Sequence, residues 1–239
     1  FHGILKYTTN KYLYIYIMRW LIMKTILVTG FDPFGGESIN PAWEAVKELE
    51  GYKVNDYKVV TKMVPTVRYD SVNAVKKAIE EHHPEAIMLV GQAGGRPDIT
   101  VERIAINIDD FRIEDNKGNQ PKDEFIVENG LPAYFSTLPI KDMVHGLQHQ
   151  GIPASISNTA GTFVCNHIFY GVAHEVINKN IRCGFVHIPY LPEQVVTKPG
   201  QPSMAKSIVI QGLQSMVNTI CSGKRYKIID PVDYVIPHE

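Results

Sequence analysis

The 239-residue sequence has few cysteines, almost no net charge and no long apolar run, and each shortage excludes a class of protein. Its three cysteines lie far apart without a CxxC pair, which excludes a disulfide framework and a cysteine-based zinc site. The 24 basic and 25 acidic side chains leave a formal charge of −1, whereas nucleic-acid binders carry a basic excess. No apolar run reaches the roughly 18 residues of a membrane span. We expect one soluble domain in a reducing, cytoplasmic setting.

The common cofactor and metal motifs are also missing. Neither GxGxxG nor GxxxxGK[ST] occurs, so the glycine-rich loops are only a weak indication of a phosphate site. His145 and His149 have the i, i+4 spacing of helical metal ligands, but the glutamate of HExxH is absent. We therefore expect neither a metal nor a cofactor.

The two ends of the sequence differ from its body. Residues 1–22 contain three basic and no acidic side chains, and Met23 directly precedes the first convincing strand. We interpret residues 1–22 as an upstream or non-native extension, and a membrane-surface anchor is the alternative. Residues 23–221 are predicted to form a single α/β domain, and residues 222–239 a C-terminal tail.

Short β-branched runs alternate with helical spacing through residues 23–221. Strands are predicted at 25–29, 57–63, 86–90, 99–108, 154–157 and 184–188. Helices are predicted from about residue 41 and over 67–83, 139–150, 160–178 and 203–220, and the polar segment 109–131 as a long excursion or hairpin. This alternation favours a twisted, mostly parallel sheet with helices on both faces.

The unusual residues of the sequence follow the ends of predicted strands, where sites form in open α/β sheets. Cys165 is the best candidate nucleophile, because Gly161 and Thr162 are residues that open helices and place it in a first turn. There the helix dipole favours the thiolate, and backbone N–H groups can hold an oxyanion. The alternative is a small core cysteine, which is how we interpret Cys183 and Cys221.

Two further residues have the chemistry that such a thiol requires. His187 ends an apolar strand and is suited to take the thiol proton and return it to a leaving amine. Glu102 lies in an apolar segment and is suited to orient that histidine. The alternatives are a satisfied core histidine and an ion pair between Glu102 and a neighbour such as Arg103.

With these residues assembled, the chain resembles the type I pyroglutamyl peptidases, also called pyrrolidone-carboxylate peptidases. The resemblance rests on five blocks that occur in order between Met23 and about residue 220: Gly30-Phe-Asp-Pro-Phe-Gly-Gly36 with Asn40-Pro-Ala-Trp43, Gly91-Gln-Ala-Gly-Gly-Arg96, Glu102-Arg-Ile-Ala-Ile-Asn107, Ala160-Gly-Thr-Phe-Val-Cys-Asn166 and His187-Ile-Pro-Tyr-Leu-Pro-Glu-Gln194. It implies a cofactor-free cysteine exopeptidase that removes N-terminal pyroglutamyl residues through a thioester. It also implies a phosphorylase/hydrolase-like three-layer fold.

By the same resemblance, Cys165 is the nucleophile, His187 the general base and Glu102 the carboxylate that orients it. Phe31 and Phe34 resemble the residues that enclose the lactam ring. The remaining substrate-binding positions implied are Asn40, Thr66, Gln92, Arg112, Ile113, Phe163 and Val164, of which Arg112 is expected near the oxyanion.

The resemblance implies pyroglutamyl peptides as substrates and a homo-oligomer, often a tetramer, with no nucleic-acid or membrane partner. Two other functions remain open on the residues alone. One is a nucleoside phosphorylase-like transferase, which would need a phosphate site, and the other is a small-molecule binding domain that uses the Phe31 and Phe34 pocket.

Overall fold

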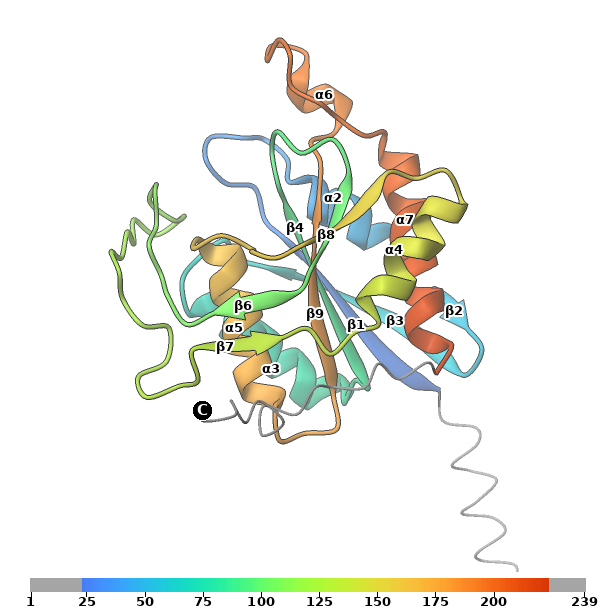
Figure 1. Ribbon diagram of the computed structural model, residues 1–239, viewed down its shortest axis with the longest axis horizontal. Helices are drawn as coiled ribbons and strands as arrows, with labels where there is room; N and C mark the ends of the chain where they lie inside the picture. Colours follow the sequence, from blue (N-terminus) through green and yellow to red (C-terminus); the bar gives the residue numbers. More distant parts are fainter. Residues whose placement is uncertain (1–22, 224–239) are drawn as a thin grey trace, which may run out of the picture.

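The computed structural model describes residues 23–223, in which a seven-stranded sheet lies between two layers of helices (Figure 1). The predictions for residues 1–22, and for the tail beyond Gly223, lie outside the described residues. None of the described helices is both long and apolar enough to cross a bilayer.

Four neighbouring strands of the main sheet run parallel, which confirms the predicted mostly parallel sheet. Strand β5 runs antiparallel to its neighbour β9, and β8 pairs parallel with β5. The short β2 pairs antiparallel with β3 at the other edge. The strand order is β2 (Lys53–Val54), β3 (Tyr57–Val64), β1 (Lys24–Phe31), β4 (Ala86–Gln92), β9 (Arg182–Ile188), β5 (Ile99–Glu102) and β8 (Ala154–Ser157).

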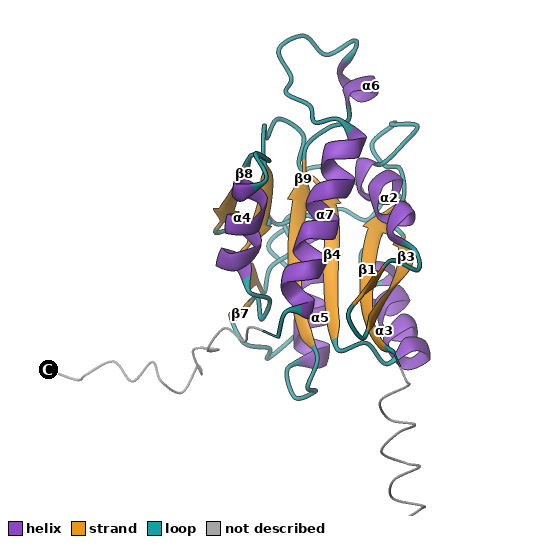
Figure 2. Cartoon of the chain, turned by 90° about the vertical axis from the view of Figure 1, so that its right-hand side faces the viewer, coloured by secondary structure: helices purple, strands orange, loops and turns teal. Residues whose placement is uncertain are grey.

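Helices cover both faces of the sheet, as the alternating pattern predicts, and each face has its own core (Figure 2). Because successive strand residues point to opposite faces, Ile26 and Val28 pack into one core and Leu27 into the other. The first core is covered by α2 (Pro41–Val46), α4 (Ile140–His149) and α7 (Lys206–Cys221), and the second by α3 (Asp70–His82) and α5 (Val164–Val176).

The predicted strand 99–108 is wrong in one respect, because it is two strands in two sheets. Strand β5 ends at Glu102, and after Arg103 the chain continues as β6 (Ile104–Ile106), which pairs antiparallel with β7 (Ala133–Phe135). The sequence did not predict four short elements, because two to four residues carry too little periodicity. They are β2, β7, the 3-10 turn η1 (Lys47–Leu49) and α6 (Pro192–Val195).

Three helices begin three or four residues later than predicted, each because the preceding backbone is not helical. Helix α7 starts at Lys206 rather than residue 203, since Ala205 has ψ +138°. Helix α5 starts at Val164, since Gly161 has φ +78° and Phe163 is extended. Thr162 does not cap this helix; its hydroxyl instead donates to the carbonyl of Asp110 at 2.8 Å. Helix α3 starts at Asp70, since Tyr69 has φ +57°.

Strands β1, β4 and β9 are adjacent and parallel, so their carboxyl ends meet at one edge of the sheet. The residues that follow Phe31, the end of β4 at Gln92 and the end of β9 near His187 therefore converge. The excursion predicted at 109–131 lies beside them and contains an isolated bridge between Asp109 and Glu124. This edge carries the candidate site.

Candidate active site

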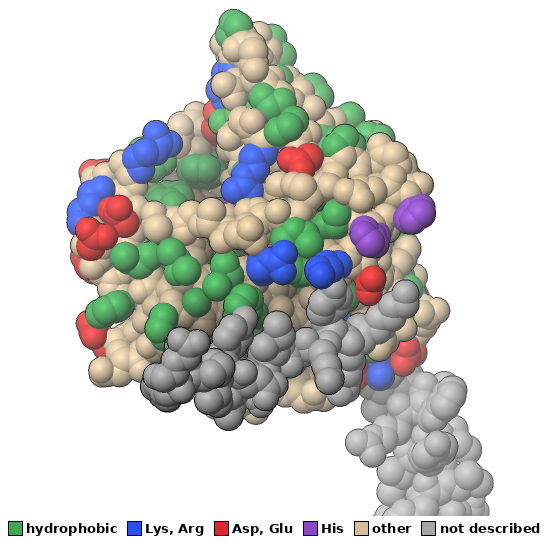
Figure 3. All heavy atoms as spheres, in the orientation of Figure 1, with side chains coloured by type: hydrophobic (Ala, Val, Ile, Leu, Met, Phe, Trp, Pro, Cys, Tyr) green, Lys and Arg blue, Asp and Glu red, His purple; other side chains and the backbone are tan. Residues whose placement is uncertain are grey.

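A pocket of about 480 Å³ opens at the carboxyl edge of the sheet, and it brings together most of the predicted site residues. Figure 3 shows the molecule hollowed in its upper left part, with hydrophobic side chains at the base of the hollow and basic side chains beside it. The predicted residues that line the pocket are Phe31, Phe34, Asn40, Thr66, Gln92, Arg112, Phe163, Cys165 and His187.

Cys165 is the second residue of α5, and the start of this helix is fixed by its neighbour Asn166. The Asn166 side chain accepts from the N–H of Ile106 at 3.0 Å and donates to the Ile106 carbonyl at 2.9 Å, so β6 and α5 are held together. On the other side, a Cβ atom on Gly91 would lie 3.0 Å from the sulfur. Gly91 is the register partner of His187 between β4 and β9. Glycine thus lets the sheet approach the thiol closely.

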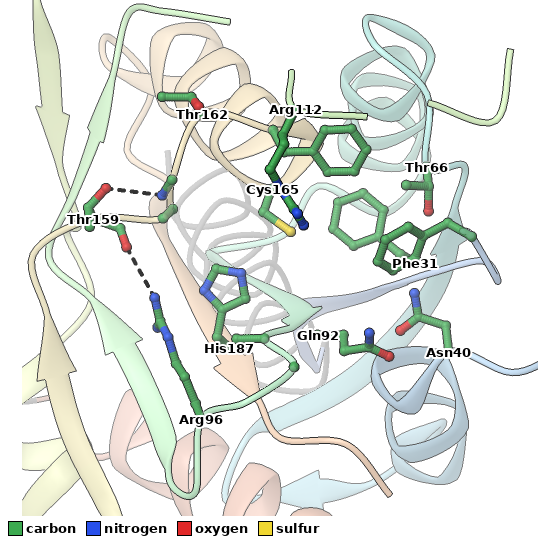
Figure 4. Close-up of a pocket in the computed structure, with 16 residues that line it drawn as sticks. Phe31, Asn40, Thr66, Gln92, Arg96, Arg112, Thr159, Thr162, Cys165 and His187 are labelled. Atoms are coloured by element: carbon green, nitrogen blue, oxygen red, sulfur yellow. Dashed lines mark hydrogen bonds between the residues drawn. The ribbon is translucent and has the colours of Figure 1, made fainter. Parts of the chain in front are cut away.

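His187 belongs to a chain of three charged or polar side chains that ends at the pocket. Its Nδ1 lies 2.7 Å from Oε1 of Glu102, and the same oxygen accepts from Nη1 of Arg96 at 2.8 Å. Glu102 is fully buried and His187 is only 4% exposed. Among the described residues no hydrogen bond engages His187 Nε2, and the ring lines the pocket beside Cys165 (Figure 4).

The electrostatics of the three groups favour a neutral thiol and a neutral imidazole at rest. Burial, with the negative charge of Glu102, raises the pKa of Cys165 to about 12. Burial also lowers the pKa of His187, although the hydrogen bond with Glu102 acts in the opposite direction. Burial opposes ionisation of Glu102 as well, but its bonds to His187 and Arg96 hold the pKa of its carboxyl below the usual value. Burial at this position therefore opposes the thiolate that the positive end of the helix dipole favours.

The other half of the pocket is apolar and carries two fixed amides. The rings of Phe34 and Phe163 lie 6.1 Å apart, centre to centre. Asn40 is the N-cap of α2: its Oδ1 accepts from the N–H of Ala42, and its Nδ2 donates to the carbonyl of Asp32. The side-chain oxygen of Gln92 accepts from Gln194 at 2.9 Å, which leaves the Gln92 NH₂ group for the pocket. These two halves meet at Cys165.

Comparison with known proteins identifies this arrangement. The model of the family described as pyroglutamyl peptidase matches residues 24–223. The chain belongs to the pyroglutamyl peptidase family. The pyrrolidone-carboxylate peptidase of Bacillus cereus strain Q1 is 59% identical over 197 residues, which cover 82% of this chain and 92% of that protein.

Solved structures of the family have the same fold. Pyroglutamyl peptidase I from Bacillus amyloliquefaciens is 48% identical, with a TM-score of 0.80 and coverage of 82% of this chain and 94% of that chain. A mutant pyrrolidone carboxyl peptidase from the hyperthermophile Pyrococcus furiosus is 40% identical, with a TM-score of 0.81 and coverage of 83% and 98%. The predicted family, fold and activity class, a cysteine peptidase for N-terminal pyroglutamyl residues, are confirmed. The family match leaves the phosphorylase-like and binding-domain alternatives without support.

Three predicted pyroglutamyl peptidase site residues lie outside the pocket lining. Glu102 is behind His187 and contacts it from the buried side. Val164 is fully buried in the second core, because one helical step from Cys165 turns its side chain away from the pocket. Ile113 lies on the excursion and is 39% exposed, and it does not line the pocket.

Arg96 is the residue that sequence reasoning missed. The alternative for Glu102 was an ion pair with a neighbour such as Arg103. Glu102 does form an ion pair, but its partner is Arg96, whereas Arg103 donates to Asn158. The signal available in the sequence was an arginine that follows Gly94 and Gly95 and comes shortly before the apolar strand that contains Glu102.

The other two cysteines are buried, at 2% exposure for Cys183 and 7% for Cys221, in keeping with a packing role. No group of three or more side chains suited to a metal occurs within residues 23–223.

Proposed function

We propose that this chain removes the N-terminal pyroglutamyl residue of peptides with Cys165 as nucleophile, His187 as general base and acid, and Glu102 as the positioning carboxylate. The observation that carries the proposal is the buried His187–Glu102 contact of 2.7 Å directed at the same pocket as Cys165. A histidine held by a carboxylate on one nitrogen and free on the other has the geometry of nucleophile activation.

The pKa directions define how the proton moves. Because the thiol and the imidazole are both neutral at rest, the thiol proton passes to His187 Nε2 as Sγ attacks the pyroglutamyl carbonyl carbon. His187 then gives this proton to the leaving amine nitrogen as the C–N bond breaks, which leaves a thioester. Water attacks the thioester, its proton returns through His187 to the sulfur, and free pyroglutamate departs.

The start of α5 supplies donors for the oxyanion. The N–H of His167 bonds to the carbonyl of Phe163 at 3.0 Å, so the N–H groups of residues 164–166 come before the helical ladder and have no partner within it. Such groups at a helix start stabilise negative charge on an attacked carbonyl oxygen. Arg112 lines the pocket near the Cys165 sulfur and adds a positive charge there (Figure 4).

The apolar half of the pocket fits the uncharged lactam ring. The phenylalanines provide apolar contact, and the free NH₂ group of Gln92 is placed to donate to a lactam carbonyl. The Asn40 side chain holds the backbone beside the pocket in place and does not bind the lactam, because its oxygen and its NH₂ group both already have backbone partners. A free N-terminal residue would have to bury its ammonium group in this slot, which is unfavourable. An N-terminal proline has no lactam carbonyl, so a substrate with proline in place of pyroglutamate would leave the Gln92 NH₂ group without an acceptor.

The decisive experiment is hydrolysis of a pyroglutamyl amide by the wild-type chain and by Cys165→Ala. We expect wild-type activity that iodoacetamide abolishes, and a loss of at least about a thousandfold in the variant. Cys183→Ala is the matched control, because this buried cysteine lies outside the pocket, and it should keep its activity. Full activity of Cys165→Ala would contradict the assignment.

Assembly and location are further parts of the proposal. Leu131, Phe135 and Ile177 are each nearly half exposed and line one groove, and hydrophobic side chains gather on the face over β6 and β7 (Figure 3). Such a surface supports the homo-oligomer, a tetramer, that the family resemblance implies. Sedimentation would give the mass directly. The free thiols are consistent with a cytoplasmic location, which cell fractionation tests.

A further inference from the structure

The pocket holds two guanidinium groups, and the binding of an uncharged pyroglutamyl group requires neither of them. Its lining contains two arginines, Arg96 and Arg112, and neither Asp nor Glu. The pyroglutamyl lactam is uncharged, so it offers no partner for a guanidinium. The oxyanion that forms during the reaction accounts for one cation near Cys165. The second cation, Arg96, pairs with buried Glu102 through Nη1, and its other N–H groups have no role in binding the acyl half of the substrate.

Arg96 lies on the opposite side of Cys165 from the lactam slot. Figure 4 shows Phe31, Asn40 and Gln92 on one side of Cys165 and His187, and Arg96 with Thr159 on the other. The scissile carbonyl must reach the Cys165 sulfur while the lactam ring occupies the first side. The leaving amine and the residue that carries it must then extend toward Arg96.

The guanidinium of Arg96 is held in place and still has donors to offer. Its Nη1 donates to Glu102 at 2.8 Å and to the hydroxyl of Thr100 at 2.5 Å. Its Nη2 has a single contact, at 3.5 Å to the carbonyl of Thr159, which is at the limit of a hydrogen bond. The side chain is 32% exposed, and a guanidinium has five N–H groups.

We propose that Arg96 forms the subsite for the residue after pyroglutamate and binds a carboxylate of that residue, foremost the C-terminal carboxylate of a pyroglutamyl dipeptide. This inference rests on the proposed function, because the orientation of the substrate follows from the lactam slot. A fixed, cationic fork is well matched to a carboxylate. The chain would therefore favour short pyroglutamyl peptides with a free C-terminus over amidated ones.

The test uses two pairs of substrates that differ within each pair only by a carboxylate. Pyroglutamyl-alanine is compared with its amide, and pyroglutamyl-glutamate amide with pyroglutamyl-glutamine amide. We expect the wild-type chain to have a kcat/KM about tenfold or more higher for the carboxylate member of at least one pair. An effect in the first pair identifies the terminal carboxylate, and one in the second pair identifies an acidic side chain.

The variant Arg96→Gln separates this subsite from the role of Arg96 beside Glu102. Loss of the Glu102 contact slows both members of a pair equally, so the ratio of their kcat/KM values reports the subsite alone. We expect this ratio to fall close to one in Arg96→Gln and to be partly kept in Arg96→Lys. Arg103→Gln removes the same charge from the next strand junction, outside the pocket, and should keep the wild-type ratio.

Three results would overturn the inference: a wild-type ratio of one in both pairs, an unchanged ratio in Arg96→Gln, or a ratio abolished by Arg112→Gln but not by Arg96→Gln. Failure of the proposed function gives a different result. In that case no member of either pair would be cleaved in a manner that depends on Cys165.

Discussion

Two histidines of this chain have nearly the same buried partners and are suited to opposite tasks. His187 contacts Glu102 through Nδ1 at 2.7 Å, and His167 contacts Asp109 through Nδ1 at 2.8 Å. In each case an arginine donates to the same carboxylate oxygen at 2.8 Å, Arg96 for Glu102 and Arg68 for Asp109. Both carboxylates are fully buried, and the other oxygen of each has no hydrogen-bond partner among the described residues.

The difference lies at the second ring nitrogen. His187 Nε2 is directed to the pocket, whereas His167 Nε2 accepts the backbone N–H of Tyr69 at 2.9 Å. A nitrogen that accepts from an N–H carries no proton and has no lone pair left for a substrate. The His167 ring is fully buried, so it joins α5 to the turn before α3.

An arginine–carboxylate–histidine group is therefore not by itself evidence of catalysis. The group orients an imidazole and fixes its tautomer, and the neighbour of the remaining nitrogen decides the outcome. Beside a thiol in a pocket the imidazole can move a proton, and against a backbone amide it stabilises the fold. Four substitutions test this distinction.

The largest expected effect is the loss of activity in His187→Ala. Without a base the thiol keeps its proton, since burial raises its pKa to about 12, and kcat/KM should fall by at least about a thousandfold. The free energy of unfolding should also fall, by less than in His167→Ala, because buried Glu102 loses one partner but no backbone N–H loses its acceptor. Hydrolysis of a pyroglutamyl amide and thermal unfolding of the same sample check both statements.

His167→Ala is the matched control and should show the reverse pattern. It leaves the Tyr69 N–H and part of Asp109 without partners in the interior, which lowers the free energy of unfolding by about 3 kcal/mol. Activity well below the unfolding midpoint should stay within about tenfold of the wild type. A fully folded but inactive His167→Ala would show that the two histidines are not functionally distinct.

Glu102→Gln should change the pH profile, because Glu102 acts through His187. Burial places the pKa of His187 below its usual value of 6.5, and the carboxylate raises it in part. Without that charge the pKa falls further, so the acidic limb of kcat/KM, which requires a neutral imidazole, moves to lower pH. We also expect kcat/KM to fall by about a hundredfold or more as the ring loses its orientation.

Asp109→Asn is the counterpart of Glu102→Gln in the second group. It should lower the free energy of unfolding by about 2 kcal/mol, because Arg68 and His167 lose a charged partner, and leave the acidic limb in place. Guanidinium unfolding and a pH profile measured in parallel distinguish the two carboxylates. A shift of the acidic limb in Asp109→Asn would mean that the second group is coupled to the reaction.

The sequence predicts the central strands and the candidate site residues better than it predicts the contacts of the two histidines. The runs at 25–29, 86–90 and 184–188 are apolar and bounded by turn residues, so the central strands follow from local pattern. The direction of β5 does not, because it depends on the chain reversing at Gly95, which has φ +88°, and pairing with a strand about 85 residues later. Cys165, His187 and Glu102 were predicted from residue chemistry together with the family blocks, and the structure brings His187 and Glu102 into contact beside Cys165.

The contacts that distinguish the two histidines are absent from any local pattern. The Asp109–His167 pair spans 58 residues, and the Glu102–His187 pair spans 85. Arg96 is six residues from Glu102, yet helix and strand periodicity gives no reason to pair them across the turn. Burial, which raises the pKa of Cys165, is likewise a property of the assembled core.

The smallest expected effect concerns the turn that presents the Tyr69 N–H to His167. Tyr69 has φ +57° and ψ −44°, and the N–H of Asp70 bonds to the carbonyl of Arg68 at 2.6 Å, which is a strained three-residue turn. Tyr69→Gly relieves this strain but loses the stacking of Arg68 on the ring and adds freedom to the unfolded chain. The free energy of unfolding should therefore change by less than about 1 kcal/mol.

Tyr69→Ala separates these contributions, because alanine loses the ring but keeps the unfavourable positive φ. We expect Tyr69→Gly to be more stable than Tyr69→Ala by about 1 kcal/mol in denaturant unfolding, with equal activity in the two variants. The reverse order would mean that the turn holds no strain. The His167 contact would then be a consequence of helix packing rather than of a backbone shaped to meet the ring.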